Sequence, residues 1–231
     1  MFDILEFDNN NYEGAKLEAN NALLEHDRIS ASFDALAAQH LQAASTSVGA
    51  SKEAYERMKQ VFGTNAAPVD TRLESRYQVQ AADLGTNLNA AIALLGSASE
   101  NRTAKEFRQA IEQADTAAAQ AGQVAEGTYK LVAENALLGI QDQISELERH
   151  GASEFASKSL ADVRQMVGRT QAQLRNNQSR EAAESAARAR AALENVKQEI
   201  AQRAASEARE ADRLIQRIEG GAGPAPAAGG M

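Results

Sequence analysis

Cysteine and tryptophan are absent from this sequence of 231 residues, and proline occurs three times. Without cysteine the chain cannot form disulfides, thiolate metal sites or a cysteine nucleophile. Aromatic residues make up 4% of the chain. Long apolar runs are missing as well, since no stretch approaches the roughly 20 residues that a membrane-spanning helix needs.

The N-terminal stretch MFDILEFDNN lacks the basic region and the long apolar region of a signal peptide. As the sequence stands we expect a cytoplasmic protein; if a signal or lipid anchor has been removed, we expect a periplasmic or envelope protein. Within residues 1–8, apolar side chains alternate with acidic ones. This pattern is typical of a helix start that folds onto the end of a bundle. A membrane-surface or partner-docking segment is the alternative, but membrane-surface helices usually carry Lys or Arg on the polar face.

Candidates for catalysis are few, because histidine occurs only as His26, His40 and His150. A di-iron bundle needs a glutamate three residues before each such histidine, and leucine or alanine stands at those positions. The glycines at 220–223 are not followed by the Lys-Ser/Thr of a phosphate-binding loop. We therefore expect no enzyme: the sequence predicts no catalytic residue, no metal ligand, no cofactor and no small-molecule substrate.

Basic charge is also scarce, since the net charge is −8. Nucleic-acid binders need a concentrated basic face to neutralise phosphates. Even in the arginine-rich stretch 178–219 acidic residues alternate with the arginines, which is typical of a solvated helix face with ion pairs between successive turns. We expect no nucleic-acid partner.

Alanine is abundant instead, with 49 residues. It favours helices by propensity while contributing little buried area, so the helices must approach one another closely along a great length. We predict an all-α protein whose long antiparallel helices form an elongated bundle or coiled coil, with a disordered C-terminal tail.

The stretch 178–219 carries the clearest helical pattern. Steps of four and three residues alternate along it, which is the spacing of an apolar seam that packs on another helix. A helix of this length is on the order of 60 Å long, so it needs partner helices along its length. The predicted seam comprises Ala182, Ala186, Ala189, Leu193, Val196 and Ile200, and a second run after a four-residue shift comprises Ala204, Ala208, Ala211, Ile215 and Ile218.

Other stretches show the same spacing. A second predicted helix-packing seam begins with Phe107, Ile111 and Ala114. The N-terminal seam comprises Ala15, Ala19, Ala22, His26, Ile29, Phe33, Leu36, His40 and Ala43. Its two histidines are about 21 Å apart on one helix, so they cannot share a metal ion. They either set the register of the helix or act as a pH sensor.

Breaks in the pattern predict the boundaries of the helices. We expect an N-terminal helical segment over 1–63, a central hairpin over 69–150, a C-terminal hairpin over 151–219 and a tail over 220–231. Residues 48–51 allow either a break or a continued helix. The predicted helix ends are a cap at Asp70, a turn over Gly96 to Asn101, a stop at His150-Gly151, a cap at Ser153 and a turn at Asn176-Asn177.

Three glycines, Gly122, Gly127 and Gly139, lie inside the pattern that runs from 103 to 150. Each costs about 1 kcal/mol relative to alanine within a helix. Either they let a neighbouring helix approach closely, or the helix bends there.

The strip from Glu148 to Arg203 contains GASEFA at 151–156, Leu160 at a helix start, and the Asn176-Asn177 turn. Alanines follow on the return helix at positions 182, 186, 189 and 192. These features resemble an Ala-rich helical-hairpin domain of unknown function that occurs in bacterial envelope lipoproteins and next to OmpA-like modules. The resemblance implies a helical hairpin and an envelope location.

Together these patterns predict a non-enzymatic helical scaffold or adaptor that binds partner proteins or self-assembles through its Ala-rich seams. One alternative is a ligand- or signal-sensing bundle, with a pocket that small residues leave between the helices. The other is a peripheral membrane protein that uses residues 1–8.

Overall fold

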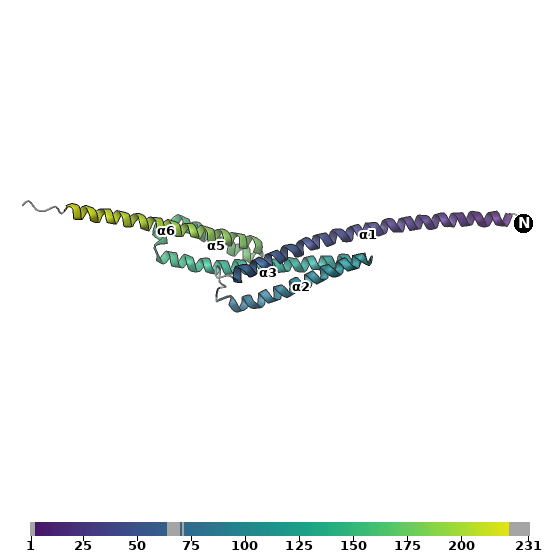
Figure 1. The fold of residues 1–231 in the computed structure, drawn as a ribbon, viewed down its shortest axis with the longest axis horizontal. Helices are drawn as coiled ribbons and strands as arrows, with labels where there is room; N and C mark the ends of the chain where they lie inside the picture. Colours follow the sequence, from purple (N-terminus) through teal and green to yellow (C-terminus); the bar gives the residue numbers. More distant parts are fainter. Residues whose placement is uncertain (1–2, 64–69, 71, 222–231) are drawn as a thin grey trace, which may run out of the picture. The chain divides into compact units, whose positions relative to one another are not determined.

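The computed structural model describes residues 3–63, 70 and 72–221, and this part of the chain is all-α, as the sequence predicts (Figure 1). Of the tail expected over 220–231, residues 220 and 221 still belong to a helix, while residues 222–231 and the loop at 64–68 lie outside the described residues. The helices of the described part are α1 (Asp3–Gly63), α2 (Glu74–Thr103), α3 (Phe107–Arg149), α4 (Ala152–Phe155), α5 (Ser157–Arg175) and α6 (Ser179–Gly221).

The chain divides into two compact units, and the boundary falls inside α3. The first unit comprises residues 1–68 and 75–128, and the second comprises 69–74 and 129–231. Each unit has its own buried core and packs three long helical segments together.

The first unit packs the C-terminal half of α1 against α2 and the first half of α3. Its core is built mostly from small side chains, which lets the three backbones approach closely. The buried hydroxyl of Ser51 on α1 donates to the carbonyl oxygen of Ala121 on α3, at 2.6 Å. The core residues that contact one another are Ala44, Ala98 and Ala114 in one cluster, and Val48, Ala91 and Ala121 in the next.

The second unit has larger core side chains. It packs the second half of α3 against α4, α5 and the first half of α6, and α5 and α6 lie side by side as a hairpin (Figure 1). The core comprises Leu137, Ile140, Ile144, Ala152, Ala156, Leu160, Val163, Val167, Ala189, Leu193 and Val196.

α1 continues without a break through residues 48–51, so of the two alternatives for this stretch the continued helix is correct. Its buried line nevertheless differs from the predicted seam. Near the bundle the predicted line passes through Leu36, His40 and Ala43, whereas the buried residues are Ala37 and Ala44, one position further along. One position turns a helix by about 100°, so packing against two helices selects a different face of α1.

The turn predicted at Gly96 to Asn101 is wrong, because α2 continues to Thr103. Ala98 is fully buried in the core, so the helix is held by packing through this stretch. It ends at Thr103, and Lys105 just beyond the end has a left-handed backbone with φ 65°. The amide of Glu106 donates to the Asn101 carbonyl at 2.8 Å and that of Lys105 to the Arg102 carbonyl at 3.0 Å, which is the hydrogen-bond pattern of a Schellman cap.

The predicted stop at His150-Gly151 is confirmed: α3 ends at Arg149, and Gly151 has a φ of 86° that favours glycine. The predicted cap at Ser153 is wrong. Ser153 lies inside α4, which begins directly after Gly151 with no side-chain cap. Ala152 and Ala156 are buried in the core, so packing of these alanines determines where the chain turns.

The predicted turn at Asn176-Asn177 is confirmed by a second Schellman cap. Asn177 is left-handed with φ 55°, and the amide of Gln178 donates to the Gln173 carbonyl at 2.9 Å. Asparagine tolerates this conformation better than most residues. The turn places α6 antiparallel to α5.

Among the three glycines of α3, only Gly127 permits a close approach. A Cβ there would lie 2.7 Å from a methyl group of Leu84 on α2, whereas a Cβ at Gly122 or Gly139 would meet nothing within 4 Å. α3 continues through all three positions.

Candidate interaction surfaces

The predicted seam of α6 lies inside the second unit. Its first five residues, from Ala182 to Val196, are buried, and Ile200 at its end is partly buried. In the first unit Ala114 is buried, while Phe107 and Ile111 are partly buried. These nine residues therefore pack within the chain.

α1 extends past α2 and α3 (Figure 1), and exposed apolar side chains gather on this extension. We name residues 12–36 the α1 arm. Of the twelve exposed large hydrophobic residues in the described part of the chain, seven lie on this arm. They are Tyr12, Leu17, Leu23, Leu24, Ile29, Phe33 and Leu36.

The second such surface is the end of α6, which extends past α5 (Figure 1). All residues from 201 to 219, which we name the α6 arm, are exposed. Leu214, Ile215 and Ile218 are its large apolar side chains. The second run of the predicted α6 seam, Ala204 to Ile218, thus has no cover within its unit.

Ion pairs fix the base of the α1 arm. The guanidinium of Arg102 donates two hydrogen bonds to the carboxylate of Asp34, at 2.8 and 3.0 Å. The same hydrogen bonds from Arg102 hold the pKa of Asp34 below its ordinary value. Nearly two turns further along, Nδ1 of His40 lies 2.6 Å from Oδ1 of Asp115 on α3. These contacts fasten the last part of the arm to the bundle.

An open groove of about 520 Å³ lies beside this base, between α1 and the end of the α2–α3 hairpin. It is lined by Asp27, Asp34, Arg102 and Lys105 among others. A similar groove of about 470 Å³ lies where α6 leaves its bundle, and Ser159 there donates to the carboxylate of Glu199 at 2.8 Å. Both grooves are wide and lined by charged side chains, so they do not resemble an enclosed apolar ligand pocket.

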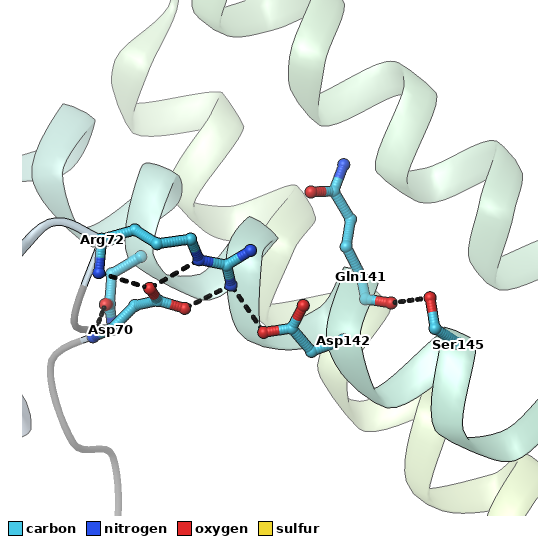
Figure 2. Close-up of polar contacts among 6 residues, drawn as sticks. Asp70, Arg72, Gln141, Asp142 and Ser145 are labelled. Carbon is cyan, nitrogen blue, oxygen red and sulfur yellow. Dashed lines mark hydrogen bonds and ion pairs between the residues drawn. The ribbon is translucent and has the colours of Figure 1, made fainter.

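A polar cluster holds the segment that precedes α2 against α3 (Figure 2). The amide of Asp70 donates to the side-chain oxygen of Asn135 at 2.9 Å, and Arg72 donates to Asp142 at 2.5 Å. Asp70 also accepts from the Arg72 amide at 2.9 Å, but this bond lies in the turn ahead of α2, which begins at Glu74, so Asp70 does not cap the helix as predicted. All of these residues belong to the second unit.

The histidines do not come together. His26 and His150 are exposed, and His40 pairs with Asp115. No group of three His, Asp or Glu side chains suited to a metal ion occurs within residues 3–63, 70 and 72–221. No helix in the same ranges has a stretch long and apolar enough to cross a bilayer.

Sequence patterns indicated both arms but did not identify them as surfaces. The N-terminal seam and the second α6 run have the same spacing as the buried runs, so periodicity does not distinguish an exposed seam from a packed one. Leu17, Leu23 and Leu24 lie off the seam and were missed. The sequence nevertheless contained a sign that these leucines form a surface, because an amphipathic helix that packs on one side rarely carries leucines on its other side.

Comparison with protein-family models, with curated proteins and with solved structures found no match. The resemblance of residues 148–203 to the envelope hairpin domain therefore stays a prediction, as does the compartment.

Proposed function

We propose that this protein is a non-enzymatic helical scaffold or adaptor that binds other protein chains through its α1 and α6 arms. The observation that carries the proposal is the concentration of exposed apolar side chains on the α1 arm. Exposed apolar side chains that share one face of the arm, such as Ile29, Phe33 and Leu36, mark an interaction site.

The energetics favour a bound state of the arms. Covering a leucine, isoleucine or phenylalanine side chain contributes roughly 1.5–3 kcal/mol. A helix that packs on nothing is marginally stable in water, so a partner helix would stabilise the arm as well as bind it. The two bundles supply the bases from which the arms extend.

Photo-crosslinking in cells tests this proposal. A photoreactive amino acid is introduced at Phe33 on the α1 arm and at Ile215 on the α6 arm. The matched control is Arg108, whose side chain is 91% exposed on the bundle surface. We expect discrete cross-linked protein products from the arm positions and none from Arg108. If neither arm position yields a product, or if Arg108 yields the same products, the proposal fails.

A further inference from the structure

The exposed seam of the α1 arm is asymmetric along its length. After Tyr12 at its start, small residues occupy its first half and larger residues its second half. In order, the exposed seam residues are Tyr12, Ala15, Ala19, Ala22, His26, Ile29, Phe33 and Leu36. A partner that packs well against this line must itself be large near Ala15 and small near Phe33.

The arm of a second copy has that distribution when it runs in the opposite direction. We propose that the α1 arms of two copies of this chain pair as an antiparallel coiled coil about a two-fold axis. This inference rests on the proposed function, since it names the partner of one arm. Pairing over residues 12–36 would be about 37 Å long.

In this register three of the four layers join a small residue to a larger one, and in the outermost layer Tyr12 faces Leu36. Three small alanines of one copy face larger side chains of the other, which is how core layers interdigitate. The facing pairs are Tyr12 with Leu36, Ala15 with Phe33, Ala19 with Ile29 and Ala22 with His26. Each pair occurs twice, because a two-fold interface uses the same surface on both copies.

In a parallel pair, each layer of the coiled coil would bring two side chains of the same size together. Ala15, Ala19 and Ala22 would each face their own copy and bury little area, while Phe33 would face Phe33 in the same narrow seam. His26 would also face His26. The antiparallel arrangement avoids these layers and brings Leu23, on the flank of the seam, against its own copy near the axis.

At its C-terminal end the seam reaches the base of the arm. His40 is the next residue on the line after Leu36, and it is partly buried and contacts Asp115 on α3. Glu25, on the opposite flank from Leu23, comes near its own copy at the axis. It is paired with Arg28 of the same helix at 3.8 Å, which reduces the repulsion.

The first test is the mass of the full chain by light scattering coupled to size exclusion, across a concentration series. We expect twice 24.6 kDa for the natural sequence. Phe33→Glu should halve that mass because it places a charge in the seam. Leu24→Glu is the matched control: Leu24 is 59% exposed and Phe33 49%, but Leu24 lies on the opposite side of the helix, so the dimer should persist. Circular dichroism checks that both variants keep their helices.

Cysteine pairing tests the direction of the helices, and the chain has no cysteine of its own to interfere. Two full-length variants, Ala15→Cys and Phe33→Cys, are oxidised separately and as a mixture. We expect a disulfide-linked dimer from the mixture alone. A parallel pair would link each variant to itself.

The inference is overturned if light scattering gives the natural chain a mass of 24.6 kDa, or any other mass than twice that value. It is also overturned if the dimer survives Phe33→Glu, or if a single cysteine variant forms a disulfide with itself. The proposed function stands in that case if photo-crosslinking at Phe33 or Ile215 captures a different protein. The proposed function fails if the arms yield no product, or if Arg108 yields the same products as the arms.

Discussion

At the scale of single residues, the cluster around Asp70 shows how a short segment is held on a long helix. Arg72 donates from Nε and Nη2 to the Asp70 carboxylate, at 2.7 and 2.5 Å, and also reaches Asp142 on α3. The hydrogen bonds from the Arg72 side chain lower the pKa of Asp70 from 3.8 to about 2. The charged form of Asp70 is therefore favoured in the folded protein.

This shift predicts a pH-dependent contribution to stability. Because the pKa of Asp70 is lower in the folded state, its contribution is fully present above about pH 4 and is lost as the pH falls towards 2. Asp70→Asn should therefore lower the melting temperature at neutral pH, and the difference from the natural sequence should shrink between pH 4 and pH 2. Thermal unfolding of the variant and the natural sequence at several pH values measures this difference in melting temperature. A difference that stays constant down to pH 2 would contradict the assignment.

At the scale of helices, the glycines differ in what surrounds them. A Cβ at Gly85 of α2 would lie 2.6 Å from the hydroxyl oxygen of Tyr55 on α1, and that hydroxyl donates to the Ala81 carbonyl at 3.0 Å. At Gly122 of α3 a Cβ would meet nothing within 4 Å. One glycine permits a close approach between two helices, and the other only weakens its own helix.

The two positions form a matched pair of substitutions within the first unit. Gly122→Ala should raise the free energy of unfolding by about 1 kcal/mol, the propensity difference between the two residues in a helix. Gly85→Ala gains the same propensity, but it displaces the Tyr55 ring and breaks a hydrogen bond that contributes roughly 1 kcal/mol. We expect no gain or a net loss for this variant in urea unfolding. Equal gains at both positions would show that the Tyr55 contact carries no energy.

At the scale of the whole molecule, the chain holds two separate cores. The first is made largely of alanine, and the second contains leucine, isoleucine and valine. Leu193 of α6 is fully buried in the second core, whereas Leu214 of the same helix is 48% exposed on the arm. Replacing each of these two leucines with alanine should therefore change the stability of the protein by different amounts.

Leu193→Ala should cost about 2–5 kcal/mol, as removal of a buried leucine side chain usually does. The loss should be local to the second unit, since cooperative units open separately. Hydrogen exchange followed by mass spectrometry should show faster exchange in α5 and in residues 179–200, with α2 unchanged. Leu214→Ala is the control and should leave hydrogen exchange unchanged in α5, in residues 179–200 and in α2. Equal acceleration in α2 would mean that the two cores unfold together.

The sequence by itself determined the helical class, the α6 seam and the ends at Gly151 and Asn177. Each of these follows from local chemistry. Alanine favours helix, steps of four and three residues place side chains on one face, and glycine or asparagine adopts the left-handed conformation of a helix cap. The end of α2 at Thr103, with its left-handed cap residue Lys105, escaped prediction because lysine carries no such signal.

Only the tertiary structure decided which seams are buried. The exposed run through Ile29 and Phe33 has the same periodicity as the buried run through Ala186 and Leu193. The difference lies in whether another helix reaches that part of the chain. The position where the α2–α3 hairpin ends, like the extent of α5, is a property of packing between distant segments. Periodicity describes one helix at a time, so it cannot show where a neighbouring helix stops and an arm begins.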